Sequence, residues 1–243
     1  MRNIKLTLEY DGSNYCGWQW QPDDNTVQKT LHSAIKSVMN DEPTLIAAGR
    51  TDSGVHALGQ VVNFKTNSHL GLDAIKNGIN RYLPNDVLVL AAEEAAADFH
   101  ARFSATKRVY RYVIAKTRRA VGRQYAWYCK YRLELERIKT ASEYLVGEHV
   151  FAVFSKETED EPHYLSYVES AEWSETERDL IFRICAKRFL HNMVRMIVGT
   201  LVEVGRGKYE PDIIEELLES GDKSRTGATA PPHGLFLEKI YYN

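Results

Sequence analysis

The order of extended and helical segments limits the fold of this 243-residue chain more than any other feature. In the first half, apolar runs typical of strands alternate with stretches whose apolar residues recur at helical spacing. The predicted segments are a strand at 5–10, a helix at 27–38, extended segments at 44–48 and 60–64, a helix at 75–83 and a strand at 87–90. This order, βαββαβ, is that of the ferredoxin-like unit.

The second half gives a similar order with extra pieces. Its predicted segments are extended stretches at 109–115 and 125–130, a helix at 133–146, strands at 165–173 and 180–186, helices at 190–202 and 211–218, and a strand at 235–242. We therefore expect an α+β fold of two ferredoxin-like (βαββαβ) halves, with antiparallel sheets side by side, helices on one face of each sheet and a central cleft. The expected domains are residues 1–105 and 106–243, although no sequence repeat supports a duplication.

Two local patterns add detail to this outline. Asn25, followed three residues later by Gln28, resembles a capping box at the start of the first helix. The acidic residues 157–161, followed by Pro162, are predicted to form a solvated loop.

Charge is strongly segregated along the chain, although the net charge is only −2. Residues 99–133, called here the basic stretch, contain no Asp or Glu, and their basic residues are Arg102, Lys107, Arg108, Arg111, Lys116, Arg118, Arg119, Arg123, Lys130 and Arg132. Aromatic residues are interleaved with these cations, a composition that suits phosphate binding and base stacking. The alternative is a solvated basic face over a core of strand aromatics.

Composition and motifs disfavour several protein classes. No run approaches the roughly 18 to 20 apolar residues of a membrane span, and the first residues are typical of a strand rather than a signal peptide, so we expect a cytoplasmic protein. The cysteines lie too far apart for a CxxC pair and are predicted to be small buried side chains: Cys16, Cys129 and Cys185. Without an HExxH motif or a Cys/His cluster, no bound metal is expected.

The segment GRTDSGVHALGQVVNF at 49–64 begins with a short polar insert rich in turn-forming residues. This insert separates the two extended segments of the first half, 44–48 and 60–64. It contains Asp52, two residues from Arg50, whose guanidinium would favour the ionised carboxylate and keep it available as a nucleophile or base. The alternative is an ordinary turn in which Asp52 accepts hydrogen bonds from the backbone amides of Ser53 and Gly54.

The motif GRTDSGVHA resembles the catalytic loop of the TruA family of tRNA pseudouridine synthases, whose catalytic aspartate corresponds to Asp52. Four further segments resemble the family in the same order: YDGSNYCGWQWQ at 10–21, DFHARFSATKRVYRY at 98–112, FLHNMVRMIVG at 189–199 and ATAPPHGLFL at 228–237. The resemblance therefore extends over nearly the whole chain.

This resemblance implies an isomerase that converts uridine to pseudouridine in the anticodon stem-loop of tRNA, at positions 38 to 40, without a cofactor. It implies tRNA as the partner of a central RNA-binding cleft, and a homodimer. The target base must be flipped out of its stack before a carboxylate can reach it. Whether Asp52 attacks the sugar, attacks the base or removes a sugar proton stays open. The rival hypotheses are an inactive RNA-binding protein on the same scaffold and, more remotely, a small-molecule enzyme.

Further site residues follow from the resemblance. Arg50 is expected to assist base flipping, or else only to pair with Asp52. Tyr110 corresponds to the active-site tyrosine that stacks on the uracil, whereas Tyr112, two residues on, is expected to pack in the sheet. Arg195 is expected to pair with Asp52, the alternative being a helix-surface arginine.

The remaining expectations concern contacts with RNA. Arg108 and Arg111 are expected to bind the substrate, as members of the basic stretch. His56, His191 and His233 are expected to be structural or to contact RNA, rather than to bind a metal.

Overall fold

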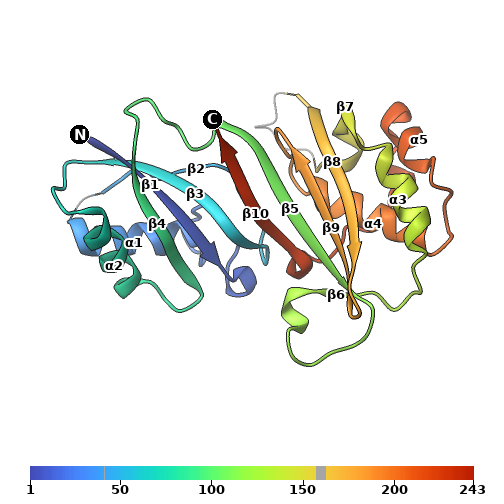
Figure 1. The fold of residues 1–243 in the computed structure, drawn as a ribbon, viewed down its shortest axis with the longest axis horizontal. Helices are drawn as coiled ribbons and strands as arrows, with labels where there is room; N and C mark the ends of the chain where they lie inside the picture. The colour runs from blue at the N-terminus through green and yellow to red at the C-terminus, as the bar shows by residue number, and fades with distance from the viewer. Residues whose placement is uncertain (41, 157–162) are drawn as a thin grey trace. The chain divides into compact units, whose positions relative to one another are not determined.

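The computed structural model describes residues 1–40, 42–156 and 163–243. They form two compact units, residues 1–106 with 236–243 (unit 1) and residues 107–235 (unit 2), whose elements are labelled in Figure 1. Within the described part of the chain, no helix has the length and apolar content needed to cross a membrane.

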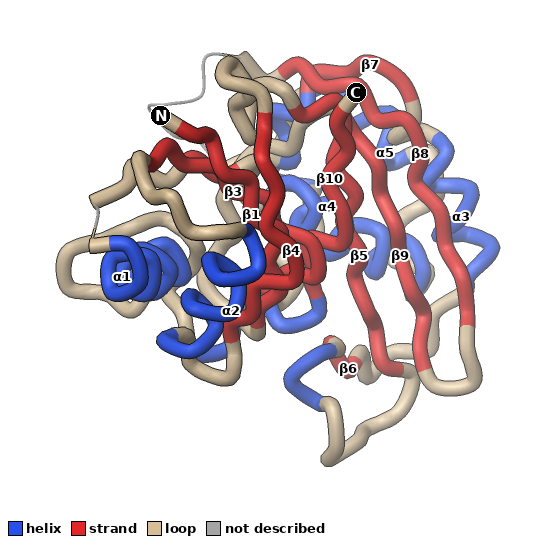
Figure 2. The backbone as a smooth tube through the Cα atoms, turned by 60° about the vertical axis from the view of Figure 1, so that its left-hand side comes forward, coloured by secondary structure: helices blue, strands red, loops and turns tan. Residues whose placement is uncertain are grey.

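Unit 1 is a sheet with two helices. Its elements are β1 (Arg2–Tyr10), α1 (Val27–Met39), β2 (Ile46–Ala47), β3 (His56–Thr66), α2 (Leu72–Tyr82), β4 (Val87–Ala95) and most of β10 (Leu235–Tyr242). β1 lies between β4 and β3 and is antiparallel to both, β2 is antiparallel to β3, and β10 runs parallel to β3. Figure 2 shows α1 and α2 side by side on one flank of these strands.

The core of unit 1 follows from strand alternation and helical periodicity. Ile4, Leu6 and Leu8 occupy alternate positions of β1, and each is fully buried. Leu31 and Ile35 lie one helical turn apart on α1 and are also fully buried. The central strand is thereby fixed in register, with Leu6 opposite Val62 of β3.

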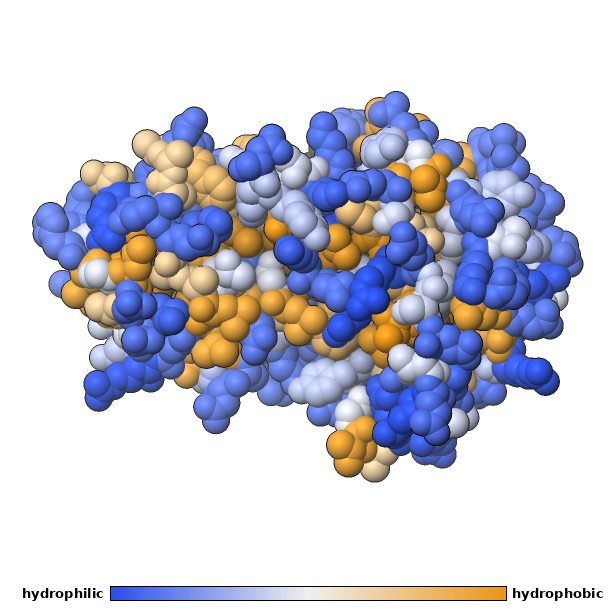
Figure 3. All heavy atoms as spheres, viewed as in Figure 1, coloured by the Kyte–Doolittle hydropathy of each residue, from blue (hydrophilic) through white to orange (hydrophobic). Residues whose placement is uncertain are grey.

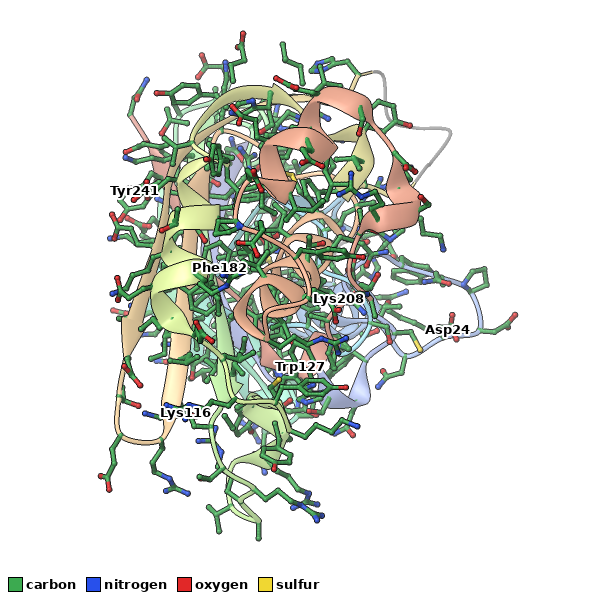
Figure 4. All side chains as sticks on the ribbon, turned by 90° about the vertical axis from the view of Figure 1, so that its right-hand side faces the viewer. Asp24, Lys116, Trp127, Phe182, Lys208 and Tyr241 are labelled. Atoms are coloured by element: carbon green, nitrogen blue, oxygen red, sulfur yellow. The ribbon has the colours of Figure 1, made fainter. Side chains whose placement is uncertain are left out.

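Unit 2 is a second sheet covered by helices. Its elements are β5 (Ala105–Ala115, beginning in unit 1), β6 (Trp127–Tyr128), α3 (Leu135–Glu143), β7 (Gly147–Val150), β8 (Leu165–Glu175), β9 (Asp179–Ala186), α4 (Met193–Gly205) and α5 (Ile213–Ser220). The strands follow the order β5-β9-β8-β7 with antiparallel neighbours, and β6 pairs in parallel with the end of β5. Figure 4 shows the helices on one side of the strands, the side on which Phe182 lies.

The mixed α/β class is confirmed, and so are the predicted helices and strands, with shifts at their ends. β7 was not predicted, because four half-exposed residues carry little periodic signal. α4 begins at Met193 rather than near residue 190, because Asn192 adopts a left-handed conformation with φ of 63°. The ferredoxin-like halves and their cleft stay predictions. The predicted division at 105/106 also stays a prediction, although the compact units group 236–243 with the first unit.

The predicted capping box is wrong. Thr26, rather than Asn25, caps α1 and accepts from the backbone N–H of Lys29 at 3.4 Å. The Asn25 amide instead donates to the carbonyl of Asn14, and the Gln28 side chain accepts from the N–H of Trp20, so both side chains hold the preceding loop.

The cysteine prediction is correct in part. Cys129 and Cys185 are buried, whereas Cys16 is exposed because it lies in the loop after β1. The acidic run predicted as a solvated loop lies outside the described residues.

Candidate active site

The candidate catalytic residue lies on the loop that joins β2 to β3, residues 49–55, called here the Asp52 loop. The Gln60 side chain donates to the carbonyl of Gly49 at 2.8 Å and fixes the start of the loop. A tight turn follows, closed by the N–H of Val55 on the carbonyl of Asp52 at 3.1 Å. Gly54 lies in this turn with φ of +75°, a conformation that glycine adopts without strain.

The segment after β1, residues 10–18, holds the Asp52 loop by hydrogen bonds and is called here the brace. The buried hydroxyls of Tyr10 and Thr51 are 2.8 Å apart. The carbonyl of Thr51 accepts from the N–H of Trp18 at 3.0 Å, and the carbonyl of Tyr15 accepts from the N–H of Gly54 at 3.2 Å. The residues on both sides of Asp52 are thus bound to one neighbouring segment.

Tyr10 acts in this arrangement as a neutral hydrogen-bonding group. Burial raises its pKa to about 12, against the smaller opposing effect of side-chain hydrogen bonds from Thr51 and Gln60. The phenol therefore keeps its proton at neutral pH, and its hydroxyl holds Thr51 by the hydrogen bond.

Two glycines allow the brace to approach the loop this closely. A Cβ on Gly17, whose φ is +89°, would lie 2.7 Å from the carbonyl oxygen of Thr51. A Cβ on Gly12 would lie 2.0 Å from the carbonyl oxygen of Val55. Side-chain atoms at such distances would displace the backbone, so the position of Asp52 depends on both glycines.

His56 closes the base of the loop from the first residue of β3. Its Nδ1 accepts from the N–H of Gly12 at 3.0 Å and lies 3.1 Å from a carboxylate oxygen of Asp11. The ring is 1% exposed and stacks on Phe236 with 4.8 Å between ring centroids. These contacts give His56 a structural role.

Asp52 itself is half-buried, and Arg50 is exposed. In the turn alternative the amides of Ser53 and Gly54 donate to the Asp52 carboxylate; the amide of Gly54 donates to the carbonyl of Tyr15 at 3.2 Å. Because the turn is closed by backbone bonds and by the brace, its geometry does not require the Asp52 side chain to bind Gly54.

The other candidates lie in unit 2. Tyr110 of β5 is 8% exposed and meets Phe189 edge-on, with ring centroids 4.9 Å apart. Tyr112 is fully buried and donates from its hydroxyl to the carbonyl of Pro231 at 2.7 Å, so it packs in the sheet. Burial raises the pKa of the Tyr112 phenol, against the opposing effect of the Arg195 charge.

Arg195 lies in the first turn of α4 and is half-buried. Its Nε donates to the carbonyl of Ala230 at 2.8 Å, and one terminal nitrogen donates to the side chain of Asn192 at 2.7 Å. These two bonds hold the guanidinium against the backbone at Ala230 and the residue that precedes α4.

The two predicted substrate-binding arginines of β5 do not come together. The register of β5 with β9 is unbroken, so alternate residues share a face, and Arg108 shares its face with Tyr110 and not with Arg111. Arg108 donates to the carbonyl of Lys187 at 2.6 Å, whereas Arg111 lies directly across from Arg183 of β9.

Sequence reasoning missed the brace pairs. Tyr10 and Thr51 are 41 residues apart, and no local pattern marks a hydroxyl pair at that separation. The glycines at 12 and 17, inside a segment otherwise rich in large residues, were the available signal.

A depression of about 370 Å³ on α1, bordered by Lys29, Ser33 and Tyr82, contains none of the predicted site residues. Within the described ranges, no group of three or more His, Cys, Asp and Glu is placed to hold a metal.

Comparison with known proteins identifies the family of the chain. A family model described as tRNA pseudouridine synthase matches residues 7–104 and 141–243. The chain belongs to the tRNA pseudouridine synthase A family. Membership assigns it an isomerase reaction, the conversion of uridine to pseudouridine in tRNA.

Relatives within the tRNA pseudouridine synthase A family match over the full length. The tRNA pseudouridine synthase A 2 of Clostridium perfringens (strain 13 / Type A) is 42% identical over 244 residues, covering 100% of both chains. The tRNA pseudouridine synthase A of Thermoanaerobacter sp. (strain X514) is 43% identical over 244 residues with the same coverage.

Similarity to solved structures is much weaker. A chain in the crystal structure of the archaeal box H/ACA sRNP Nop10-Cbf5 complex is 11% identical with a TM-score of 0.37, covering 91% of this chain and 59% of that chain. Likeness at this level carries no argument about function.

Proposed function

We propose that this member of the tRNA pseudouridine synthase A family modifies uridines at positions 38 to 40 of the tRNA anticodon stem-loop, with Asp52 as the essential carboxylate and without a cofactor. The N1–C1′ glycosidic bond breaks, the uracil turns in the site, and a C5–C1′ bond forms. C5 loses its hydrogen while N1 gains one, so the reaction needs no oxidant and no second substrate.

The observation that carries the choice of Asp52 is the brace. Thr51 on one side of the residue and Gly54 on the other are hydrogen-bonded to residues 10–18, and Gly17 packs against the backbone at Asp52. A carboxylate that must meet a flipped nucleotide needs a fixed backbone position, because misplacement by about 1 Å can cost on the order of a hundredfold in rate. An ordinary surface turn has no need of such support.

The other residues receive supporting roles. Arg50, exposed beside Asp52, assists base flipping. Tyr110 stacks on the uracil, and its edge-on contact with Phe189 fixes the ring. Arg195, oriented by Ala230 and Asn192, orients the carboxylate of Asp52, which a double-mutant cycle tests.

Arg108, on the same face as Tyr110, binds substrate phosphates, and Arg111 contributes charge from the opposite face of β5. The enzyme acts in the cytoplasm as a homodimer, and gel filtration with light scattering tests the dimer.

Tritium release from tRNA labelled at uracil C5 tests the function. We expect wild type to release tritium without added cofactor, Asp52→Asn to release none, and the tRNA affinity of Asp52→Asn to stay within about tenfold, or roughly 1.4 kcal/mol. Asp24→Asn, at an aspartate that is half-buried like Asp52 and lies outside the Asp52 loop, is the matched control and should retain full activity. Turnover by Asp52→Asn would overturn the assignment, and tight binding without release by wild type would favour a binding protein.

A further inference from the structure

The structure divides the basic stretch according to the partners of its cations. Three of them form ion pairs with acidic side chains of β8 and β9. These paired cations, with their N–O distances, are Lys107 with Glu169 at 2.8 Å, Lys116 with Glu175 at 2.9 Å, and Arg119 with Asp179 at 2.8 Å. Each pair has no net charge, so a phosphate gains little by approaching it.

Four other cations of the stretch form a second set, called here the open cations: Arg118, Arg123, Lys130 and Arg132. All four are exposed, and none forms an ion pair within residues 1–40, 42–156 and 163–243. Arg123 donates to the carbonyl of Ala120 at 3.1 Å, and Lys130 lies 5.2 Å from the ring centroid of Tyr131. Their positive charge is therefore not neutralised by carboxylates.

The segment that carries the open cations is anchored at both ends. β6 returns alongside the end of β5, with Trp127 opposite Ile114, which closes residues 116–126 into a loop. The ion pair of Arg119 with Asp179 ties the loop to β9, and Gly122 turns the chain with φ of +75°. Figures 1 and 2 both show this loop projecting beyond the ends of β5 and β9.

In Figure 3 hydrophilic residues cover much of the projecting loop, with an apolar group at its lower end, where Val121 is exposed. Figure 4 shows nitrogen-tipped side chains extending from this loop at the bottom of the view. An anchored loop loses little conformational entropy when it binds a partner. The basic stretch also contains no acidic residue that would repel a polyanion.

Aromatic rings lie near the open cations. Tyr131 lies against Lys130 and Arg206, whose guanidinium carbon is 4.6 Å from the ring centroid. Trp127 meets Tyr112 edge-on. Tyr125, Tyr128 and Tyr131 are nevertheless exposed, so this surface offers rings beside its charge. The open cations themselves suit the sugar-phosphate backbone, whose charge they complement.

We propose that the open cations bind the phosphate backbone of tRNA, whereas the paired cations contribute little to RNA binding. This inference rests on the proposed function, which supplies RNA as the partner. It adds a phosphate contact at the projecting loop and at the residues that follow β6 to the contacts proposed for Tyr110 and Arg108 of β5. The contact reads no base sequence, because phosphates carry no sequence information directly.

The test compares two double variants with equal loss of charge. Arg118→Gln/Arg123→Gln removes two open cations, and Lys107→Gln/Lys116→Gln removes two paired cations from the same stretch. We measure tRNA affinity over a series of salt concentrations. Each lost phosphate contact lowers the steepness of the log–log slope by about 0.7 to 0.9, so the open variant should lose about 1.5 and bind about tenfold more weakly at low salt.

The paired variant should keep a slope close to that of wild type. Equal slopes for the two variants would overturn the inference, and so would an open variant with the wild-type slope. Lys130→Gln/Arg132→Gln removes the other two open cations, and its salt slope can be compared with that of the paired variant in the same way. If one variant fails to fold, shown by its circular dichroism spectrum, the remaining open pair decides.

Turnover separates this inference from the proposed function. The open variant should release tritium with unchanged kcat at saturating tRNA and a raised KM, because its residues touch no reacting atom. Wild-type activity with indistinguishable slopes would refute only the inference. Absence of wild-type activity with the expected slopes would refute only the proposed function.

Discussion

Replacing Gly17 with alanine tests whether the brace positions Asp52. Gly17 has φ of +89°, and the new Cβ would lie 2.7 Å from the carbonyl oxygen of Thr51 and 3.2 Å from the carbonyl carbon of Asp52. Gly207 offers a matched control, because its φ is +79° and a Cβ there meets nothing within 4 Å. Both variants incur the left-handed strain of an alanine, whereas only Gly17→Ala pushes on the Asp52 loop.

The expected magnitudes follow from these two effects. The strain costs about 1 to 2 kcal/mol in either variant. Overpacking against backbone atoms that cannot rotate away adds about 1 to 3 kcal/mol for Gly17→Ala. For a chain of this size, each kcal/mol lowers the melting temperature by about 2 to 4 °C. Gly17→Ala should therefore be clearly the less stable of the two in urea unfolding.

Measurements of kcat and KM for Gly17→Ala and Gly207→Ala test the effect on catalysis. A shift of the Asp52 backbone by a fraction of an ångström should lower kcat by about tenfold or more while changing KM little, because the substrate-binding surface stays intact. Gly207→Ala should keep the wild-type kcat. If both variants lost equal stability, or if Gly17→Ala kept full kcat below its melting temperature, the argument that the brace positions Asp52 would be refuted.

Two further predictions concern stability. Tyr112→Phe removes the buried hydrogen bond to the carbonyl of Pro231 and should lower the unfolding free energy by about 1 to 2 kcal/mol. Tyr82 is exposed, so Tyr82→Phe should cause almost no change. Equal urea midpoints for the two variants would contradict this prediction. Burial lowers the pKa of His233, against the smaller opposing effect of its hydrogen bond to the backbone of Ala126, so the folded state disfavours the protonated ring. Stability should therefore fall as the pH drops below the ordinary histidine value of about 6.5, and His233→Gln should show a smaller fall in melting temperature; identical pH profiles would exclude this role.

Local patterns in the sequence were sufficient for the order of helices and strands and for the location of the Asp52 loop. Buried strands and helices leave a periodic record, as in the alternation of Ile4, Leu6 and Leu8. A polar, turn-forming insert between two apolar strands stands out against that record. The opposite faces of Arg108 and Arg111 did not follow from the predicted strand, because that strand began at residue 109 whereas β5 begins at Ala105.

Sequence alone determined the fold class, the family and the candidate carboxylate, because each depends on residues that are neighbours along the chain. Tertiary structure decided which groups meet across long separations: the hydroxyls of Tyr10 and Thr51, and the capping of α1 by Thr26 rather than Asn25. It also sorted cations with the same local sequence character, so that Arg119 is paired with Asp179 while Arg118 is exposed. Such pairings depend on strand register and loop path, which a residue's own neighbours do not encode.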